Sequence, residues 1–340
     1  MHVDLRRDFL LAYFPNPLHS VEILGVDLDA TRVETGFITL MTLPAVAKSI
    51  LAFAGTTITF KNLDDAVMLL DTTRPLIEVK LDHPQPELPA NQPDSFEAII
   101  QHDYAIVLRP RTLELYSLTR FRRGEDGLQS LSPVLVHQFQ FRIDSCRMER
   151  HLSPHLLNSP GSNTATPPIH ILIRYSSLFP WPVNLLHHYT LYPNPSYDPV
   201  PSGTSLDVVN ASNSPYYITP VLLHTLSSPV RLFSITDMTL GRYGTALWLD
   251  SHTEDYFYQG ERGQRLAGRK LSVPENLGNN FESTSPSLES QDQNTEAAAS
   301  MVFEFNENDD WNRIAVDDKE GWIAIGSTDG EIIVNEYACA

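Results

Sequence analysis

The sequence is poor in cysteine, in long apolar runs and in basic residues. Its 340 residues include two cysteines, Cys146 and Cys339, far apart in the chain, which excludes a disulfide-rich secreted domain. The longest weakly polar stretch, 40–55, is interrupted by a proline and a lysine and does not have the character of a transmembrane helix. The apolar run 9–14 lacks the small-residue cleavage site of a signal peptide. We therefore expect a cytoplasmic or nuclear protein without a membrane segment.

The sequence contains 24 Lys and Arg and 42 Asp and Glu, which gives a net charge of −18. Such an excess of negative charge makes nucleic acids and anionic membrane surfaces poor partners. Much of the acid lies in residues 275–340, where 15 Asp and Glu accompany only Arg313 and Lys319 as bases. An acidic end of this kind usually forms a solvated surface.

Signatures of catalysis and of metal binding are missing as well. The chain contains no Gly-x-Ser-x-Gly, His-Glu-x-x-His or Gly-x-Gly-x-x-Gly motif. Segment 263–270 follows a phosphate-loop pattern for six positions and then fails, because Arg269 stands where the lysine belongs. Residues 306–310 have the oxygen spacing of a calcium loop, but Trp311 replaces the required glycine. We expect no cofactor, no metal and no catalytic residue.

The sequence does contain many short strands joined by tight turns. Its 25 prolines leave little room for long helices. Short runs rich in Val, Ile, Leu, Phe or Tyr flank turn residues, which is the pattern of β-hairpins. The predicted hairpins pair 9–13 with 21–26, 50–54 with 57–60, 104–108 with 113–118, 246–249 with 256–258, and 323–326 with 332–334. Further strands are predicted at 134–141, 169–175 and 186–191.

The last repeat is the most regular. Segments 313–317, 322–326 and 331–337 predict a three-stranded meander, in which Asp329-Gly330 supplies the positive φ of a two-residue turn. One meander cannot cover both of its faces, so such units stack on copies of themselves.

These repeats predict an all-β fold, namely a WD-repeat-like β-propeller. The chain has room for roughly five to seven irregular blades of about 40 residues. We expect a single propeller domain over 1–340, N-terminally incomplete or closed by a strand from residues 3–13. Flexible insertions are expected at 156–168, 193–215 and 272–300. A pair of β-sandwiches accounts equally well for the strands, but not for the matched hairpins.

Three segments, 104–116, 236–250 with 263–268, and 310–337, are similar to the degenerate WD-repeat-like propeller that follows the F-box in large families of fungal F-box proteins. The middle segment carries the most specific part of the resemblance, Thr236-Asp-Met-Thr-Leu-Gly-Arg-Tyr-Gly-Thr-Ala-Leu-Trp-Leu-Asp250. The resemblance implies a propeller that recruits substrates to a ubiquitin ligase. The F-box itself is not present in this sequence, so the resemblance does not extend to binding of the ligase core.

The turns are the candidate binding sites. Two arginine-rich stretches, 109–123 and 262–270, stand out in an acidic protein. They form either a solvated surface or a site for an acidic peptide. If the hairpin turns all join second and third strands of blades, they share one rim. The predicted partner-binding residues on this rim are Arg109, Arg111, His252, Glu254 and Asp329, together with Asn16 and Gly55.

Arg109 and Arg111 flank Pro110, so their turn is stiff, and two guanidinium groups there would grip a carboxylate or a phosphate. We expect this pair to contribute more to binding than Arg122 and Arg123, and we expect its removal to leave the fold intact.

Other polar and aromatic residues receive plainer interpretations. His187 and His188 point to opposite faces of a strand and are not expected to share a metal. Trp248, Trp311 and Trp322 are expected to pack between blades. The function favoured by these observations is a non-catalytic protein–protein interaction module. The alternatives are a degenerate family member without retained function and a propeller hydrolase that uses Asp317.

Overall fold

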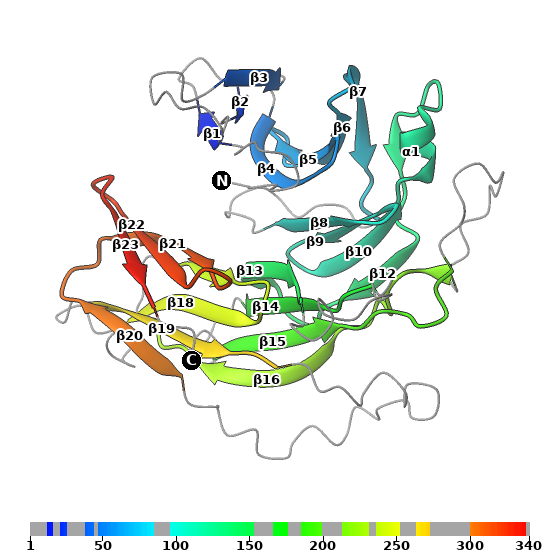
Figure 1. The fold of residues 1–340 in the computed structure, drawn as a ribbon. Coiled ribbons are helices and arrows are strands. Elements are labelled where there is room, and N and C mark those ends of the chain that lie inside the picture. The colour runs from blue at the N-terminus through cyan, green and yellow to red at the C-terminus, as the bar shows by residue number, and fades with distance from the viewer. Residues whose placement is uncertain are drawn as a thin grey trace. The chain divides into compact units, whose positions relative to one another are not determined.

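The computed structural model describes residues 12–15, 21–25, 38–43, 47–84, 96–152, 166–175, 185–198, 213–230, 236–251, 263–272 and 300–337, the first three ranges by their backbone alone. The chain divides into two compact units, Met1–His137 and Gln138–Ala340. Both units are built from small, mainly antiparallel sheets (Figure 1).

Unit 1 contains three sheets. The first consists of β1 (Ala12–Pro15), β2 (Val21–Gly25) and β3 (Ile38–Leu43). The second consists of β4 (Ala47–Ala54), β5 (Thr57–Asn62), β6 (Val67–Asp71) and β7 (Arg74–Leu81), and the short parallel strand β11 (Ser130–Leu131) extends it. The third consists of β8 (Glu97–Gln101), β9 (Tyr104–Leu108), β10 (Thr112–Ser117) and β12 (Leu135–Gln138). Helix α1 (Thr119–Arg123) follows β10.

Unit 2 contains three further sheets. The first consists of β13 (Ile143–Arg150), β14 (Ile169–Tyr175), β15 (Leu185–Leu191) and β16 (Val221–Ser227). The second consists of β17 (Met238–Leu240), β18 (Thr245–Ser251), β19 (Gln264–Lys270) and β20 (Met301–Asn306). The third is the three-stranded meander of β21 (Trp311–Asp317), β22 (Trp322–Ser327) and β23 (Ile332–Glu336).

The sheets have the arrangement of propeller blades. In each sheet the strands run as an antiparallel meander, and β11 is the single parallel addition among the described strands. The first strands of neighbouring sheets contact one another: β4 contacts β8 in unit 1, and β17 contacts β13 and β21 in unit 2. This is the packing of innermost blade strands. The prediction of an all-β, WD-repeat-like β-propeller is confirmed, and α1 is the only helix in the described part of the chain.

Several predicted strands agree closely with the structure. Strands β9 and β14 have the predicted bounds, and the closing meander is present as β21, β22 and β23. The prediction for 134–141 is too long, since β12 ends at Gln138. Ten further strands were not predicted, namely β3, β6, β7, β8, β11, β13, β16, β17, β19 and β20. The predicted strand 256–258, the closing segment 3–11 and most of the three insertions lie outside the described residues.

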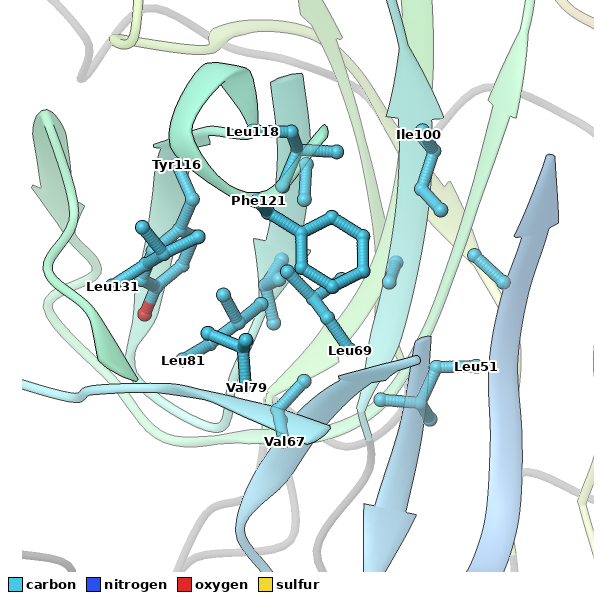
Figure 2. Packing of buried hydrophobic residues seen from close by; sticks show 14 residues of the cluster. Leu51, Val67, Leu69, Val79, Leu81, Ile100, Tyr116, Leu118, Phe121 and Leu131 are labelled. Carbon is cyan, nitrogen blue, oxygen red and sulfur yellow. The ribbon is translucent and has the colours of Figure 1, made fainter. Parts of the chain in front are cut away.

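The core of unit 1 lies between its second and third sheets (Figure 2). Leu51, Leu69 and Val79 approach from the second sheet, and Ile100 approaches from the third. Phe121 is the one buried residue of α1, and it anchors the helix in the same cluster. Burial of each such side chain stabilises the fold by about 1.5–3 kcal/mol.

Unit 2 contains a buried row of histidines across its first sheet. His170 of β14 and His188 of β15 are fully buried, and the His170 Nδ1 and His188 Nε2 atoms lie 2.7 Å apart. The ring of His151, just after β13, contacts His170 with ring centroids 4.6 Å apart, and His224 of β16 stacks on His188 at 5.5 Å. His187 contacts Tyr175 instead, so the predicted opposite orientation of the two adjacent histidines is confirmed.

Burial keeps the histidine row uncharged. Loss of hydration lowers the pKa of His170 to about 3 and that of His188 to about 2, and the neighbouring imidazoles act in the same direction. Arg269 lies close enough to His188 to lower its pKa further, while Asp318 acts in the opposite direction on His151.

We expect the histidine row to make the protein sensitive to acid. In the unfolded chain His170 and His188 bind protons near pH 6.5, whereas in the folded chain they bind them only at much lower pH. The free energy of unfolding therefore has its full value above pH 6.5 and decreases as the pH falls towards 3. Each histidine removes about 1.4 kcal/mol per pH unit within this window. Asp250 acts oppositely between pH 3.8 and about 6, because burial raises its pKa to about 6.

Urea unfolding checks this expectation. The wild type and a His170→Gln/His188→Gln variant are compared at several pH values between about 7 and 4, a range that includes the ordinary histidine pKa. The variant should show a flatter pH dependence, whatever its stability at neutral pH. Parallel pH profiles for the two proteins would contradict it.

Candidate interaction surface

The turn between β9 and β10 holds the two arginines that were predicted to share a rim. The Arg109 backbone N–H donates to the Thr112 carbonyl at 2.8 Å, which closes the hairpin. Arg109 is only 2% exposed, whereas Arg111 is exposed. The two guanidinium groups therefore do not form one exposed clamp, and the interpretation of Arg109 as a rim cation is wrong.

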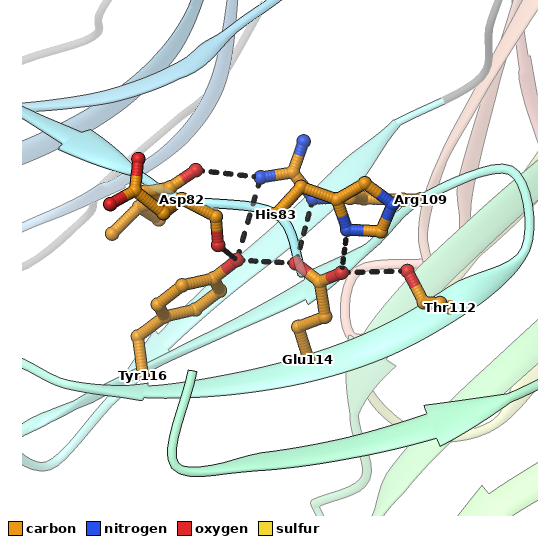
Figure 3. Close-up of polar contacts among 7 residues, drawn as sticks. Asp82, His83, Arg109, Thr112, Glu114 and Tyr116 are labelled. Atoms are coloured by element: carbon orange, nitrogen blue, oxygen red, sulfur yellow. Dashed lines mark hydrogen bonds and ion pairs between the residues drawn. The ribbon is translucent and has the colours of Figure 1, made fainter. Parts of the chain in front are cut away.

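Arg109 belongs to a buried polar network around Glu114 (Figure 3). The Arg109 Nε donates to Glu114 Oε2 at 2.7 Å, and the Thr112 hydroxyl donates to Glu114 Oε1 at 2.8 Å. The Tyr116 hydroxyl also donates to Glu114, and His83 Nδ1 lies 2.5 Å from Glu114 Oε1. Burial alone would raise the pKa of Glu114, but the contacts with His83, Arg109 and Tyr116 lower it to about 2.

The same network joins the second and third sheets of unit 1. Arg109 Nη2 donates to the carbonyl of Leu81 at 3.0 Å, and the Tyr116 hydroxyl lies 2.9 Å from the carbonyl of Asp82. Leu81 is the last residue of β7, and Asp82 follows it directly. Arg109 is thus a structural residue, and its replacement should destabilise the fold, because the buried Glu114 carboxylate would lose the guanidinium group that pairs with it.

The other predicted arginines of this region lie on the surface. Arg120 Nε is 2.6 Å from Glu125, and Arg122 Nη1 is 2.5 Å from Asp103. Arg111 has no hydrogen-bond or ion-pair partner among the residues described here. Its charge is therefore more available to a ligand than that of Arg122.

The remaining predicted rim residues are only partly placed. Asp329 is exposed in the turn between β22 and β23, where its carboxylate accepts hydrogen bonds from Ser327 and from the Glu331 backbone N–H, and these bonds lower its pKa. Gly55 lies in the β4–β5 turn with φ of +60°, so it joins a first strand to a second, and its assignment to a second-to-third turn is wrong. Asn16, His252 and Glu254 lie outside the described residues.

Two strands of unit 2 carry a surface that sequence reasoning did not identify. β20 and β23 are the outermost described strands of their sheets, and both expose large apolar side chains. Phe305 is 62% exposed and Ile332 is 72% exposed. The remaining exposed apolar residues of these two strands are Met301, Val302, Phe303, Ile333 and Val334.

The two strands approach each other, and their exposed apolar residues, 301–305 and 332–334, are called here the C-terminal apolar surface. The Asn335 side chain donates to Glu304 at 3.0 Å, and the rings of Phe303 and Tyr337 have centroids 6.4 Å apart. The amino-acid pattern gave no sign of this exposure, because strands of this composition are usually buried.

The tryptophans divide between core and surface. Trp248 and Trp311 are buried, as predicted. Trp322 is 44% exposed, so the described residues of unit 2 do not show its predicted packing between blades. It begins β22 and is paired with Glu336 at the end of β23, in a sheet with only three described strands.

The described residues also bear on the other chemical candidates. Within them, no group of three or more His, Cys, Asp or Glu side chains is placed to hold a metal ion. Asp317 accepts hydrogen bonds from the backbone N–H groups of Lys319 and Glu320 at 3.0 and 3.1 Å, so its carboxylate caps the β21–β22 turn. Among these same residues no helix is long and apolar enough to cross a membrane.

Replacement of Glu114 by Gln should destabilise the protein by about 3 kcal/mol, because it removes the buried ion pair between Glu114 and Arg109. The matched control is Glu125→Gln, which breaks the exposed pair with Arg120 and should cost less than about 1 kcal/mol. Urea unfolding at neutral pH measures both. Equal midpoints for the two variants would show that the network contributes little.

Comparisons with known proteins support the fold. A scan against protein-family models and a search of curated proteins both found no match. Among solved structures, a candidate 6-phosphogluconolactonase from Bacteroides fragilis is similar with a TM-score of 0.52 and 8% identity, over 98% of this chain and 78% of that chain. The β-propeller domain of Cps50 (Swd1) from Myceliophteria thermophila has a TM-score of 0.48 and 9% identity, over 97% and 80% of the two chains. The WD40 domain of SCAP from fission yeast has a TM-score of 0.43 and 10% identity, over 93% and 65%. At such identities the likeness concerns the fold alone.

Proposed function

We propose that this propeller is a non-catalytic protein–protein interaction module. The observation that carries the proposal is the C-terminal apolar surface. Exposed apolar side chains gathered on two neighbouring strands of an otherwise well-packed β-protein are typical of a binding face. Aromatic and methionine side chains, here Met301, Phe303 and Phe305, are enriched in the centres of such faces.

The turn between β9 and β10 supplies a second element of the proposal. Arg111 is exposed beside Pro110, and the buried network around Glu114 holds the base of this turn. A fixed turn loses less conformational freedom when a partner binds. We therefore keep Arg111 and Asp329 as partner-binding residues, with an acidic peptide as the ligand for Arg111.

A more specific role is suggested by the resemblance to propellers of fungal F-box proteins, which covers 104–116, 236–250 with 263–268, and 310–337. In this role the module recruits substrates for a ubiquitin ligase. The test is whether proteins captured by the chain become more abundant in cells when its gene is deleted. Unchanged abundance of every captured protein would leave an interaction module without this role.

The C-terminal apolar surface should dominate partner capture. Replacing Phe305 or Ile332 by Asp should weaken capture by about 2 kcal/mol or more, which is roughly thirtyfold, because a charge would be forced into a desolvated contact. Quantitative affinity capture from a lysate, followed by titration of the captured protein, measures the loss.

The control is Leu63→Asp, because Leu63 is a comparably exposed apolar residue, at 60%, in the β5–β6 turn. This variant should capture the partner as the wild type does. Equal losses for all three variants would count against the surface, and capture of no partner by the wild type would favour a protein without retained function.

Arg111 should contribute separately. Arg111→Ala should keep the fold and weaken binding of an acidic partner by about 1–3 kcal/mol, as expected for a charge-assisted contact. Arg122→Ala is the matched control, because Arg122 is already paired with Asp103. Loss of the partner in the Arg122 variant alone would show that the binding turn is assigned wrongly.

A further inference from the structure

The sequence contains two Asp-Gly pairs, Asp126-Gly127 and Asp329-Gly330. We propose that the first pair is a site of spontaneous covalent modification, at which Asp126 is converted into isoaspartate, and that this conversion releases strand β11 from β7. The second pair consists of the same two residues but lies in a turn that slows the reaction. The inference concerns unit 1 and is independent of the proposed interaction function.

The reaction needs only the pair itself and water. The backbone nitrogen of the glycine attacks the side-chain carboxyl carbon of the aspartate, forms a C–N bond with it and gives up its proton, while the carboxyl OH leaves as water. The product is a cyclic succinimide, which water then opens at either carbonyl. Opening at the α-carbonyl gives isoaspartate, in which the main chain runs through the former side chain. A following glycine favours the attack, because it has no Cβ to hinder the approach.

The atoms that react in the first pair are free of hydrogen bonds within the described part of the chain. Asp126 and Gly127 are both exposed in the segment that follows helix α1. Neither the Asp126 carboxylate nor the Gly127 N–H has a hydrogen-bond partner among the described residues. Gly127 has a φ of +76°, and a Cβ at this position would meet no atom within 4 Å. The carboxyl carbon and the nitrogen can therefore approach each other without first breaking a contact.

The same atoms of the second pair are engaged. The Asp329 carboxylate accepts hydrogen bonds from the Ser327 hydroxyl and from the Glu331 N–H, the latter at 3.3 Å. These bonds lower the pKa of Asp329, which disfavours the neutral acid from which water can leave. The Gly330 N–H donates to the Ser327 carbonyl at 3.2 Å. Ring closure at Asp329 therefore has to break these bonds first.

Conversion of Asp126 would change the turn in which the pair lies. The Leu128 N–H donates to the Glu125 carbonyl at 3.3 Å, across the pair, and Leu128 packs against the core of unit 1. Isoaspartate lengthens the main chain by a methylene group between these two positions. Because this hydrogen bond is already long, it tolerates little further separation of its ends. We therefore expect the turn to open.

The opened turn leads directly into β11. The carbonyls of Gln129 and Leu131 accept hydrogen bonds from the Lys80 and Asp82 N–H groups, each at 2.9 Å, and these bonds hold β11 against β7. β11 consists of only two residues, so it has little further pairing with which to resist displacement. Its pairing with β7 should therefore weaken as the protein ages.

Peptide mapping of the full chain by mass spectrometry tests the proposal. The protein is aged at neutral pH in water labelled with heavy oxygen and then digested in ordinary water with trypsin, which separates the two pairs into peptides 124–142 and 320–340. Opening of the succinimide adds a heavy oxygen atom, and fragmentation distinguishes isoaspartate from aspartate. We expect conversion at Asp126 to be at least about tenfold faster than at Asp329, because the hydrogen bonds of the second pair have to break first.

Three controls accompany the measurement. In urea both pairs lose their folded surroundings and should convert at similar rates. Asp126→Glu keeps the charge but would have to close a larger and less favourable ring, so it should abolish conversion at this position. Ser327→Ala removes a donor to the Asp329 carboxylate and should speed conversion there.

The site is overturned if Asp126 takes up no heavy oxygen, or if Asp329 converts as fast as Asp126 in the folded chain. Hydrogen exchange tests the consequence for β11, because the Lys80 and Asp82 amides should exchange faster in the aged wild type than in the equally aged Asp126→Glu variant. Equal exchange in these two proteins would overturn the release of β11 from β7.

Discussion

No sheet of this protein can cover both of its own apolar faces, and the rest of the structure follows from that constraint. Strands β14 and β18 are buried along their whole length, which requires a packed layer on each side. Stacking of meanders supplies those layers within each unit. Stacking also places the ends of strands in one sheet against the next sheet, where buried backbone N–H and C=O groups need hydrogen-bond partners.

Buried polar side chains supply these partners, and they determine how the sheets join. In unit 1 the Glu114 network connects β9 and β10 to the end of β7. In unit 2 Asp237 accepts hydrogen bonds from Arg147 of β13 at 2.9 Å and from the Ile314 N–H of β21 at 3.0 Å, so one carboxylate joins two sheets. Gln264 does the same through both amide atoms, which bond to the backbone of Trp311.

The fold could be predicted from the sequence because hairpin chemistry is local, whereas the candidate site could not. An Asp-Gly pair between two apolar runs fixes the turn at 329–330 without knowledge of the rest of the chain. The burial of Arg109 depends on Glu114 and on the carbonyl of Leu81, which lies 28 positions away. Charged residues usually lie on the surface, so a prediction from the sequence places an arginine there. This prediction fails for an arginine such as Arg109 whose counter-charge is buried. β19 was missed for a related reason, because its basic residues conceal the buried Leu266 and Ala267.

The C-terminal apolar surface was missed because an apolar strand has the same sequence whether or not another layer covers it. What distinguishes β20 and β23 is their position at the outside of their sheets. An exposed apolar edge normally leads to aggregation. Here the acidic residues of 300–337 oppose association of like surfaces. The negative charge that the sequence places in this region thus protects the exposed apolar strands β20 and β23 against self-association.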